Sequence, residues 1–135
     1  MTIPRAVLAF TAAGFIGFGL AFTFWPGSMA ALVEVGLPTP TARVDFAATY
    51  GGFELGFGAF LLLALLRPIW IEPGLWAGLL ALGGFATVRS GTLLLTGAPV
   101  SPANYLALSL ELAGVLLNLW ALRAARRGQI SLTGG

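Results

Sequence analysis

The sequence of 135 residues contains no cysteine and no histidine. These absences exclude disulfides, thiolate nucleophiles, haem held by histidine and ordinary zinc sites. They also remove the side chain that most often acts as a general base near neutral pH, and with it a histidine-based hydrolytic triad. Acid–base chemistry therefore falls to carboxylates, tyrosines or water, and we expect neither a metal site nor a cofactor.

Charge is equally scarce, because charged residues make up 9% of the chain and hydrophobic residues make up 58%. A soluble domain usually carries about 25% charged residues, so this chain could not cover a water-facing surface. All seven basic residues are arginines. No basic run is interleaved with aromatic residues in a polar context, so we expect no nucleic-acid partner. The composition instead indicates an integral membrane protein whose main partner is the lipid bilayer.

Four long apolar segments are present, each of about 20 residues, which is the length that crosses hydrocarbon as a helix. Prolines lie between the segments, where helices should stop or restart. In the first loop, the pattern from Ser28 to Val35 predicts a short interfacial helix closed by Gly36. We therefore predict an all-α fold, a transmembrane four-helix bundle in one domain over residues 1–135. The expected spans are at about 6–25, 47–66, 74–95 and 103–122.

The arginines set the expected orientation, because cytoplasmic loops of membrane proteins carry an excess of basic residues. Only Arg43 lies in the first or third loop. The N-terminus, the second loop and the C-terminus hold Arg5, Arg67, Arg123, Arg126 and Arg127. This asymmetry predicts that both termini are cytoplasmic.

Small residues at intervals of four should mark helix contacts, because helices in lipid associate through close packing and polar contacts. Some of them could instead border a ligand cavity. The sets of this kind are Ala13, Gly17 and Ala21; Gly52 and Gly56; Gly74 and Gly78; and Gly83, Thr87 and Gly91.

Three ionisable residues lie inside the predicted spans, namely Glu54, Arg89 and Glu111. With the inferred topology each lies about 9–12 Å below the outer end of its helix, so the three share one layer. A charge at the centre of a helix costs roughly 2.5–3.5 kcal/mol on insertion scales. We therefore expect Arg89 to bridge both carboxylates through its planar fork. One carboxylate then lacks a cation of its own, which suits a proton relay, a general acid or a site for a cation or amine.

Polar side chains surround these charges at helical spacing. Asn104 and Asn118 lie seven residues before and after Glu111 and share its face. The others lie about one turn from a charge or near the expected mouth of the cavity. The catalytic candidates are Glu54, Glu111 and Arg89, and the ligand-binding candidates are Tyr50, Asn104, Arg43, Asp45, Thr92 and Asn118.

These residues leave several functions open, together with a purely structural role for the ion pairs. The first is to bind or transform a small lipophilic molecule that enters from the outer leaflet or the periplasm, by cofactor-free isomerisation, cyclisation or hydration if the site is catalytic. The second is proton-coupled transport or a channel, as a homo-oligomer. The third is that of an accessory subunit of a larger membrane complex, with a contact ridge on the first span formed by Gly14, Phe15, Phe18 and Phe22.

Three motifs run along the chain: Arg43-Val-Asp-Phe-Ala-Ala-Thr-Tyr50-Gly51-Gly52-Phe-Glu54-Leu-Gly56; Arg89-Ser-Gly91 followed by Gly97-Ala98-Pro99; and Glu111-Leu in the fourth span. Together they resemble an uncharacterised bacterial family of small four-span membrane proteins, a domain of unknown function, over nearly the whole chain. The similarity to DoxX-type four-span proteins is weaker. The resemblance implies a multi-pass protein of the bacterial inner (plasma) membrane. It also implies that Arg43, Tyr50, Glu54, Arg89 and Glu111 form one set.

Overall fold

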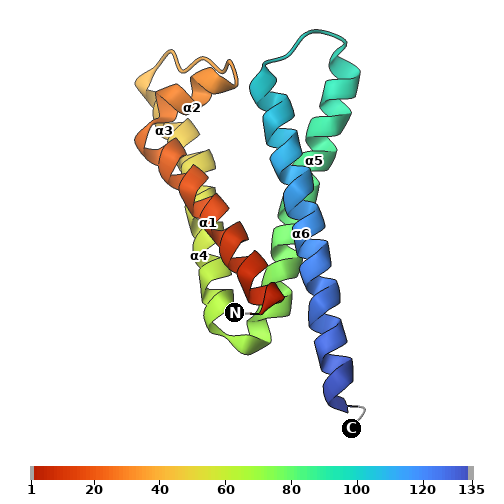
Figure 1. Ribbon diagram of the computed structural model, residues 1–135. Helices are drawn as coiled ribbons and strands as arrows, with labels where there is room; N and C mark the ends of the chain where they lie inside the picture. Colours follow the sequence, from red (N-terminus) through yellow and green to blue (C-terminus); the bar gives the residue numbers. More distant parts are fainter. Residues whose placement is uncertain (1, 134–135) are drawn as a thin grey trace.

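The computed structural model describes residues 2–133, with the side chains of residues 2–127, so residue 1 and residues 134–135 of the predicted domain lie outside the described part. Most of the described residues are helical, and none of them lies in a strand. Four stretches are long and apolar enough to cross a membrane: Ile3–Phe24, Pro40–Leu66, Pro68–Thr96 and Pro102–Arg127. The structure therefore confirms the predicted all-α bundle of four membrane-spanning helices (Figure 1).

Prolines mark most of the helix starts, as the sequence predicts. A proline in the first turn loses no hydrogen bond, because the first N–H groups of a helix have no partner within it. Such prolines lie in the first turn of the first, second and fourth spans. They also begin the short helix after the first span and the 3₁₀ turn that leads into the third span. In chain order the elements are α1 (Ile3–Phe24), α2 (Pro26–Leu32), α3 (Pro40–Phe46), the π-helical turn η1 (Ala47–Gly52), α4 (Phe53–Leu66), the 3₁₀ turn η2 (Pro68–Trp70), α5 (Ile71–Thr96) and α6 (Pro102–Thr133).

The first loop differs from the prediction in two respects. Its short helix, α2, ends at Leu32, and the left-handed residue after it is Glu34, with φ of 59°, and not Gly36. The second span begins at Pro40, earlier than the predicted start, because Thr39 caps the helix by accepting a hydrogen bond of 3.1 Å from the backbone N–H of Ala42. Much of the predicted loop is therefore helix, and α3, η1 and α4 form one span.

The four spans form two hairpins. α1 packs along η1 and α4, and α5 packs along α6. The hairpins meet at the end that holds the start of α1 and the connection from α4 to α5, and they diverge toward the opposite end (Figure 1). We call the first end the closed half and the other the open half. At the far end of the open half, the Ser101 hydroxyl donates a hydrogen bond of 3.0 Å to the Leu32 carbonyl and links the hairpins again.

The hydrophobic core lies in the closed half. Leu8 of α1, Leu61 of α4 and Leu75 of α5 are all 0% exposed and belong to one cluster of buried residues. Gly74 permits this close approach, because a Cβ at its position would lie 2.8 Å from the Cβ of Ala64. The hairpins are therefore joined by ordinary close packing at one end.

Only part of the small-residue prediction is correct. Gly74 and Gly78 of the third span do face neighbouring helices at close range. In the first two spans, by contrast, a Cβ at Gly17, Gly52 or Gly56 would meet no neighbouring helix of the described chain within 4 Å, so that part of the prediction is wrong. The close contacts between α1 and the second span are made instead by Gly19, Gly51 and Gly58. A four-residue repeat identifies small residues but does not identify the face that meets a partner.

The predicted contact ridge of the first span is divided between two environments. Gly14 and Phe18 are exposed. Phe15 is 7% exposed and packs within the bundle, with its ring centroid 4.6 Å from that of Phe57. Phe22 packs against aromatic rings of the second span. These residues therefore do not form one continuous exposed ridge for a partner protein.

Candidate functional site

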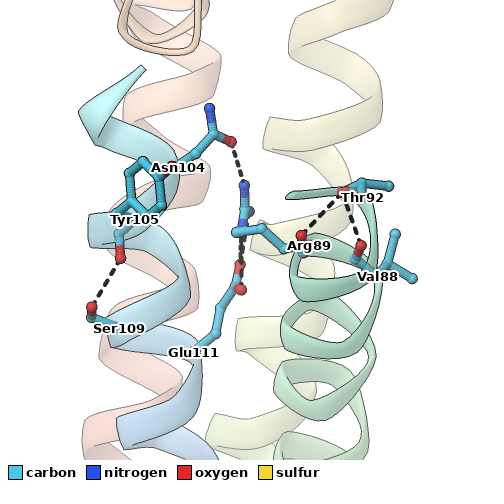
Figure 2. A network of polar contacts seen from close by, with 7 residues as sticks. All are labelled: Val88, Arg89, Thr92, Asn104, Tyr105, Ser109 and Glu111. Carbon is cyan, nitrogen blue, oxygen red and sulfur yellow. Dashed lines mark hydrogen bonds and ion pairs between the residues drawn. The ribbon is translucent and has the colours of Figure 1, made fainter. Parts of the chain in front are cut away.

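Arg89 and Glu111 form a buried ion pair between α5 and α6, as predicted (Figure 2). The Arg89 Nη2 donates to Glu111 Oε1 at 2.7 Å, and Nε donates to Oε1 at 3.0 Å and to Oε2 at 3.1 Å. The side chain of Glu111 is 10% exposed and that of Arg89 is 26% exposed. Two N–H groups of one planar guanidinium thus bind one carboxylate, an arrangement that fixes both side chains.

Asn104 makes a further contact with the guanidinium. The Arg89 Nη1 donates a hydrogen bond of 2.9 Å to Asn104 Oδ1. Asn104 precedes Glu111 on α6 by seven residues, which places both on one face of that helix. The amide oxygen faces Arg89, so the amide nitrogen points away from it (Figure 2). Two members of the polar stripe predicted on α6, Asn104 and Glu111, therefore hold Arg89 from two sides.

Thr92 lies one turn beyond Arg89 and bonds to its own helix. Its hydroxyl donates to the carbonyl oxygens of Val88 at 2.9 Å and Arg89 at 3.1 Å. The hydroxyl of Thr96 donates in the same way to Thr92, at 2.7 Å. The hydrogen of each hydroxyl is thus used by the backbone, a common arrangement for threonine in a membrane helix.

An open groove of about 750 Å³ runs along α5 in the open half. We call it the α5 groove. Leu80 and Val88 in its wall are 68% and 67% exposed, so the groove is open on the side where acyl chains would lie in a membrane. The apolar lining is Phe53, Leu80, Ala81, Gly84, Phe85, Val88, Leu93 and Val100, and the polar lining is Arg89, Thr92, Thr96 and Asn104. Arg89 and Asn104 are therefore hydrogen-bonding groups set in an otherwise mainly apolar surface.

Glu54 does not share Arg89, and the expected bridge to two carboxylates is not formed. Arg89 pairs with Glu111 alone among the described residues. The reason is the division into hairpins, because α4 pairs with α1 and α5 pairs with α6, and the hairpins diverge at this level. Glu54 lies between Gly51 and Gly58, which both pack on α1, and its Oε2 is buried with no hydrogen-bond partner in the described part of the chain.

The remaining candidates of the second span form no hydrogen bond or ion pair with Arg89 in the described part of the chain. Arg43 and Asp45 are exposed on α3, and a side chain on Gly27 of α2 would lie 3.5 Å from the Arg43 Nη2. Tyr50 of η1 is 49% exposed, and its ring packs 4.7 Å from that of Phe46. None of these three candidates lines the α5 groove.

Asn118 belongs to the closed half and is 0% exposed. Its Nδ2 donates to Thr11 Oγ1 at 3.2 Å and to the carbonyl of Gly114 at 2.9 Å. Its Oδ1 is buried and has no hydrogen-bond partner among the described residues. Asn118 therefore links α6 to α1, and it lies too deep among the helices to line the α5 groove.

Two kinds of residue are missing from the sequence-based candidates. Thr11 is one, although a threonine at the middle of the mainly apolar first span is a signal that could have indicated a buried partner. The apolar lining of the groove is the other, including Phe53, Gly84 and Phe85. Apolar residues that face a groove carry no sequence signal that distinguishes them from residues that face lipid.

The model of a family described as a domain of unknown function (DUF4345) matches residues 3–122. No curated protein and no solved structure matches the chain. The matched range includes Arg89, Asn104 and Glu111 and the whole of the α5 groove.

Proposed function

The chain belongs to the DUF4345 family and is a multi-pass membrane protein, and from this premise we propose that the α5 groove binds a small lipophilic molecule whose polar head lies at Arg89 and Asn104. One observation carries the proposal. A mainly apolar groove, open toward the place of the acyl chains, contains a guanidinium held in a fixed position by Glu111. An apolar lining with a small number of fixed polar groups is what a site for a small molecule requires.

The groove lies in the outer half of the membrane if both termini are cytoplasmic, which is the orientation that we propose. The arginine asymmetry supports this orientation, as Arg67 and Arg123 lie at the same end as the termini while Arg43 lies at the other. Both described ends of the chain lie toward the end of the molecule where the hairpins meet (Figure 1). In a bacterial inner membrane, the molecule would enter the groove from the outer leaflet or the periplasm.

Binding is better supported than transformation. Glu111 is engaged by Arg89 and does not line the groove, and Glu54 lies on the other hairpin. A catalytic carboxyl would have to come within hydrogen-bond reach of the reacting group. The catalytic roles that the sequence suggests for Glu54, Arg89 and Glu111 therefore give way to a head-group role for Arg89 and a positioning role for Glu111.

Glu54 favours a second candidate function, proton-coupled transport. A carboxyl with a buried oxygen and no partner among the described residues suits a group that takes up and releases a proton. A continuous path for protons through the closed half is not favoured, because the side chains there are tightly packed. Those that are 0% exposed include Leu8, Leu61, Leu75 and Asn118. The test measures proton flux in liposomes with an imposed pH gradient. Flux that is lost in Glu54→Gln but kept in Glu34→Gln would support transport, and equal flux in the two variants would exclude a transport role for Glu54.

The test of the proposed function compares two substitutions of the same kind on α5. Gly84 lines the groove and Gly91 does not, and within the described residues no other side chain and no backbone of another helix lies within 4 Å of a Cβ built at either position. Gly84→Leu should fill the groove without disturbing Arg89, and Gly91→Leu is the matched control. Each protein is purified in mild detergent and its bound lipophilic molecules are extracted and identified by mass spectrometry.

The wild type and Gly91→Leu should retain a lipophilic compound that Gly84→Leu loses, with equal melting temperatures for the two variants. The same extracted compounds in the same amounts from all three proteins would contradict a binding role for the groove.

A further inference from the structure

Resting on the proposed function, we infer that the ligand of the α5 groove has an uncharged head that accepts hydrogen bonds, as the carbonyl oxygen of an ester, ketone or quinone does. The inference comes from the hydrogen-bond donors that Arg89 and Asn104 leave free and from the balance of charge around them. The expected ligands therefore form a narrower chemical class than lipophilic molecules in general.

Arg89 presents unused donors to the groove. A guanidinium has five N–H groups. Three of them are engaged, namely that of Nε and one of Nη2 with Glu111, and one of Nη1 with Asn104. Five less three leaves two N–H groups, one on each terminal nitrogen, with no acceptor among the described residues. Arg89 lines the groove, so an acceptor on a bound molecule can reach this side chain.

Asn104 adds donors beside those of Arg89. Its Oδ1 accepts from Arg89, which leaves the amide N–H groups turned away from the guanidinium (Figure 2). These N–H groups have no acceptor in the described part of the chain. The hydroxyls of Thr92 and Thr96 donate to backbone carbonyls and add no donor. Around the level of Arg89, the groove therefore offers donors to an acceptor on the ligand.

Charge decides between the acceptors that could use these donors. Arg89 and Glu111 carry opposite charges at 2.7 Å, so the site is neutral as a whole. A carboxylate head would bring a second negative charge close to Glu111 in a medium of low dielectric constant, and an ammonium head would meet the positive charge of Arg89. An uncharged acceptor meets neither repulsion and still receives charge-assisted hydrogen bonds.

The position of the tail follows from the lining of the groove. Leu80, Ala81, Gly84 and Phe85 lie on the side of Arg89 toward the closed half, and all four are apolar. Leu80 precedes Arg89 by nine residues, which correspond to about 13 Å along a helix. We place the tail of the ligand along this stretch and its carbonyl oxygen at Arg89 and Asn104.

The experiment uses four probes with the same twelve-carbon chain length: methyl laurate, laurate, dodecylamine and dodecane. Binding to the full chain is measured by native mass spectrometry from a short polyoxyethylene detergent, for the wild type, Gly84→Leu, Gly91→Leu and Asn104→Leu. Methyl laurate should bind the wild type and Gly91→Leu about tenfold more tightly than each other probe, the ratio expected from a charge-assisted hydrogen bond. Gly84→Leu should bind none of them.

Asn104→Leu should bind methyl laurate and dodecane more nearly equally, because it removes the two N–H donors of the amide, frees only one N–H of Arg89 and keeps the apolar lining. Preferred binding of laurate or dodecylamine, with loss in Gly84→Leu, would overturn the inference about the head and leave the proposed function standing. If the wild type bound all four probes equally and Gly84→Leu abolished that binding, the inference about the head would also be overturned and the proposed function would stand. Binding of no probe by the wild type, or binding that Gly84→Leu does not change, would overturn both.

Discussion

The two halves of this bundle place polar residues in opposite ways. In the closed half, Asn118 of α6 bonds to Thr11 of α1 and so links one hairpin to the other within a packed core. In the open half, Arg89 and Glu111 lie on the same hairpin, and the side of Arg89 that faces the groove remains free. The difference teaches that a polar contact embedded in the packed core joins the two hairpins, whereas one within a hairpin leaves room beside it.

The same contrast holds for apolar packing. Leu61 and Leu75 on facing spans of the closed half are 0% exposed, whereas Leu80 and Val88 on α5 in the open half are 68% and 67% exposed. Lipid is as apolar as leucine, so exposure of these side chains costs little in a membrane. The open half can therefore persist without being filled by protein.

The substitution with the largest expected effect removes the ion pair of the open half. Arg89→Ala leaves Glu111, which is 8% exposed, without a cation. We expect the free energy of unfolding to fall by about 3 kcal/mol, because an uncompensated buried charge remains. The measurement is thermal or denaturant unfolding in detergent micelles.

Two controls sharpen this prediction. Arg89→Leu combined with Glu111→Leu should recover most of the loss, because it removes both charges together. Arg126→Ala breaks an exposed pair with Glu72 at 4.0 Å and should cost less than about 1 kcal/mol. Equal melting temperatures for Arg89→Ala and Arg126→Ala would mean that the stability of the protein does not depend on the ion pair of the open half.

The next effect concerns glycines of α5 in the two halves. A Cβ at Gly74 would lie 2.8 Å from Ala64 and 3.1 Å from Leu8, whereas nothing lies within 4 Å of one at Gly84. Gly74→Leu should therefore lower the free energy of unfolding by about 2–3 kcal/mol through overpacking. Gly84→Leu should change it by less than about 0.5 kcal/mol. The unfolding curves of the two variants test the contrast directly, and a reversed order would break it.

A smaller effect is expected at the hydrogen bond between Thr11 and Asn118 in the closed half. The double-mutant cycle of Thr11→Val and Asn118→Leu isolates the hydrogen bond of 3.2 Å between the hairpins. We expect a coupling free energy of about 1 kcal/mol, as for other hydrogen bonds between membrane helices. The same cycle applied to Thr92→Val and Asn118→Leu should give no coupling, since these residues share no contact.

The smallest effect lies away from the packed helices, at the left-handed residue of the first loop. Glu34 has φ of 59°, a conformation that favours glycine. Glu34→Gly should raise the free energy of unfolding by about 0.5 kcal/mol, because relief of strain exceeds the entropy that glycine adds to the unfolded chain. Glu34→Ala keeps the strain and should give no increase, and a gain in this variant would contradict the assigned backbone conformation.

Particular residues show what sequence reasoning can and cannot reach. The pairing of Arg89 with Glu111 is predictable, because each charge is costly alone at its depth and the pair reduces that cost. The same reasoning wrongly included Glu54 as a second partner of Arg89. Depth along a helix follows from residue number, but lateral position depends on which helix is the neighbour. Glu54 has the right depth and the wrong hairpin.

The sequence by itself determined the four membrane-spanning helices, their starts at prolines and the pairing of Arg89 with Glu111. These properties follow from local terms, namely the transfer of apolar side chains into lipid, the missing N–H group of proline and the cost of a charge in hydrocarbon. Only the tertiary structure decided the pairing of α1 with α4 and of α5 with α6, the divergence of the hairpins and the α5 groove. The physical reason is that leucine gains almost nothing by leaving lipid for a protein interface, so the sequence carries no apolar signal for which faces meet.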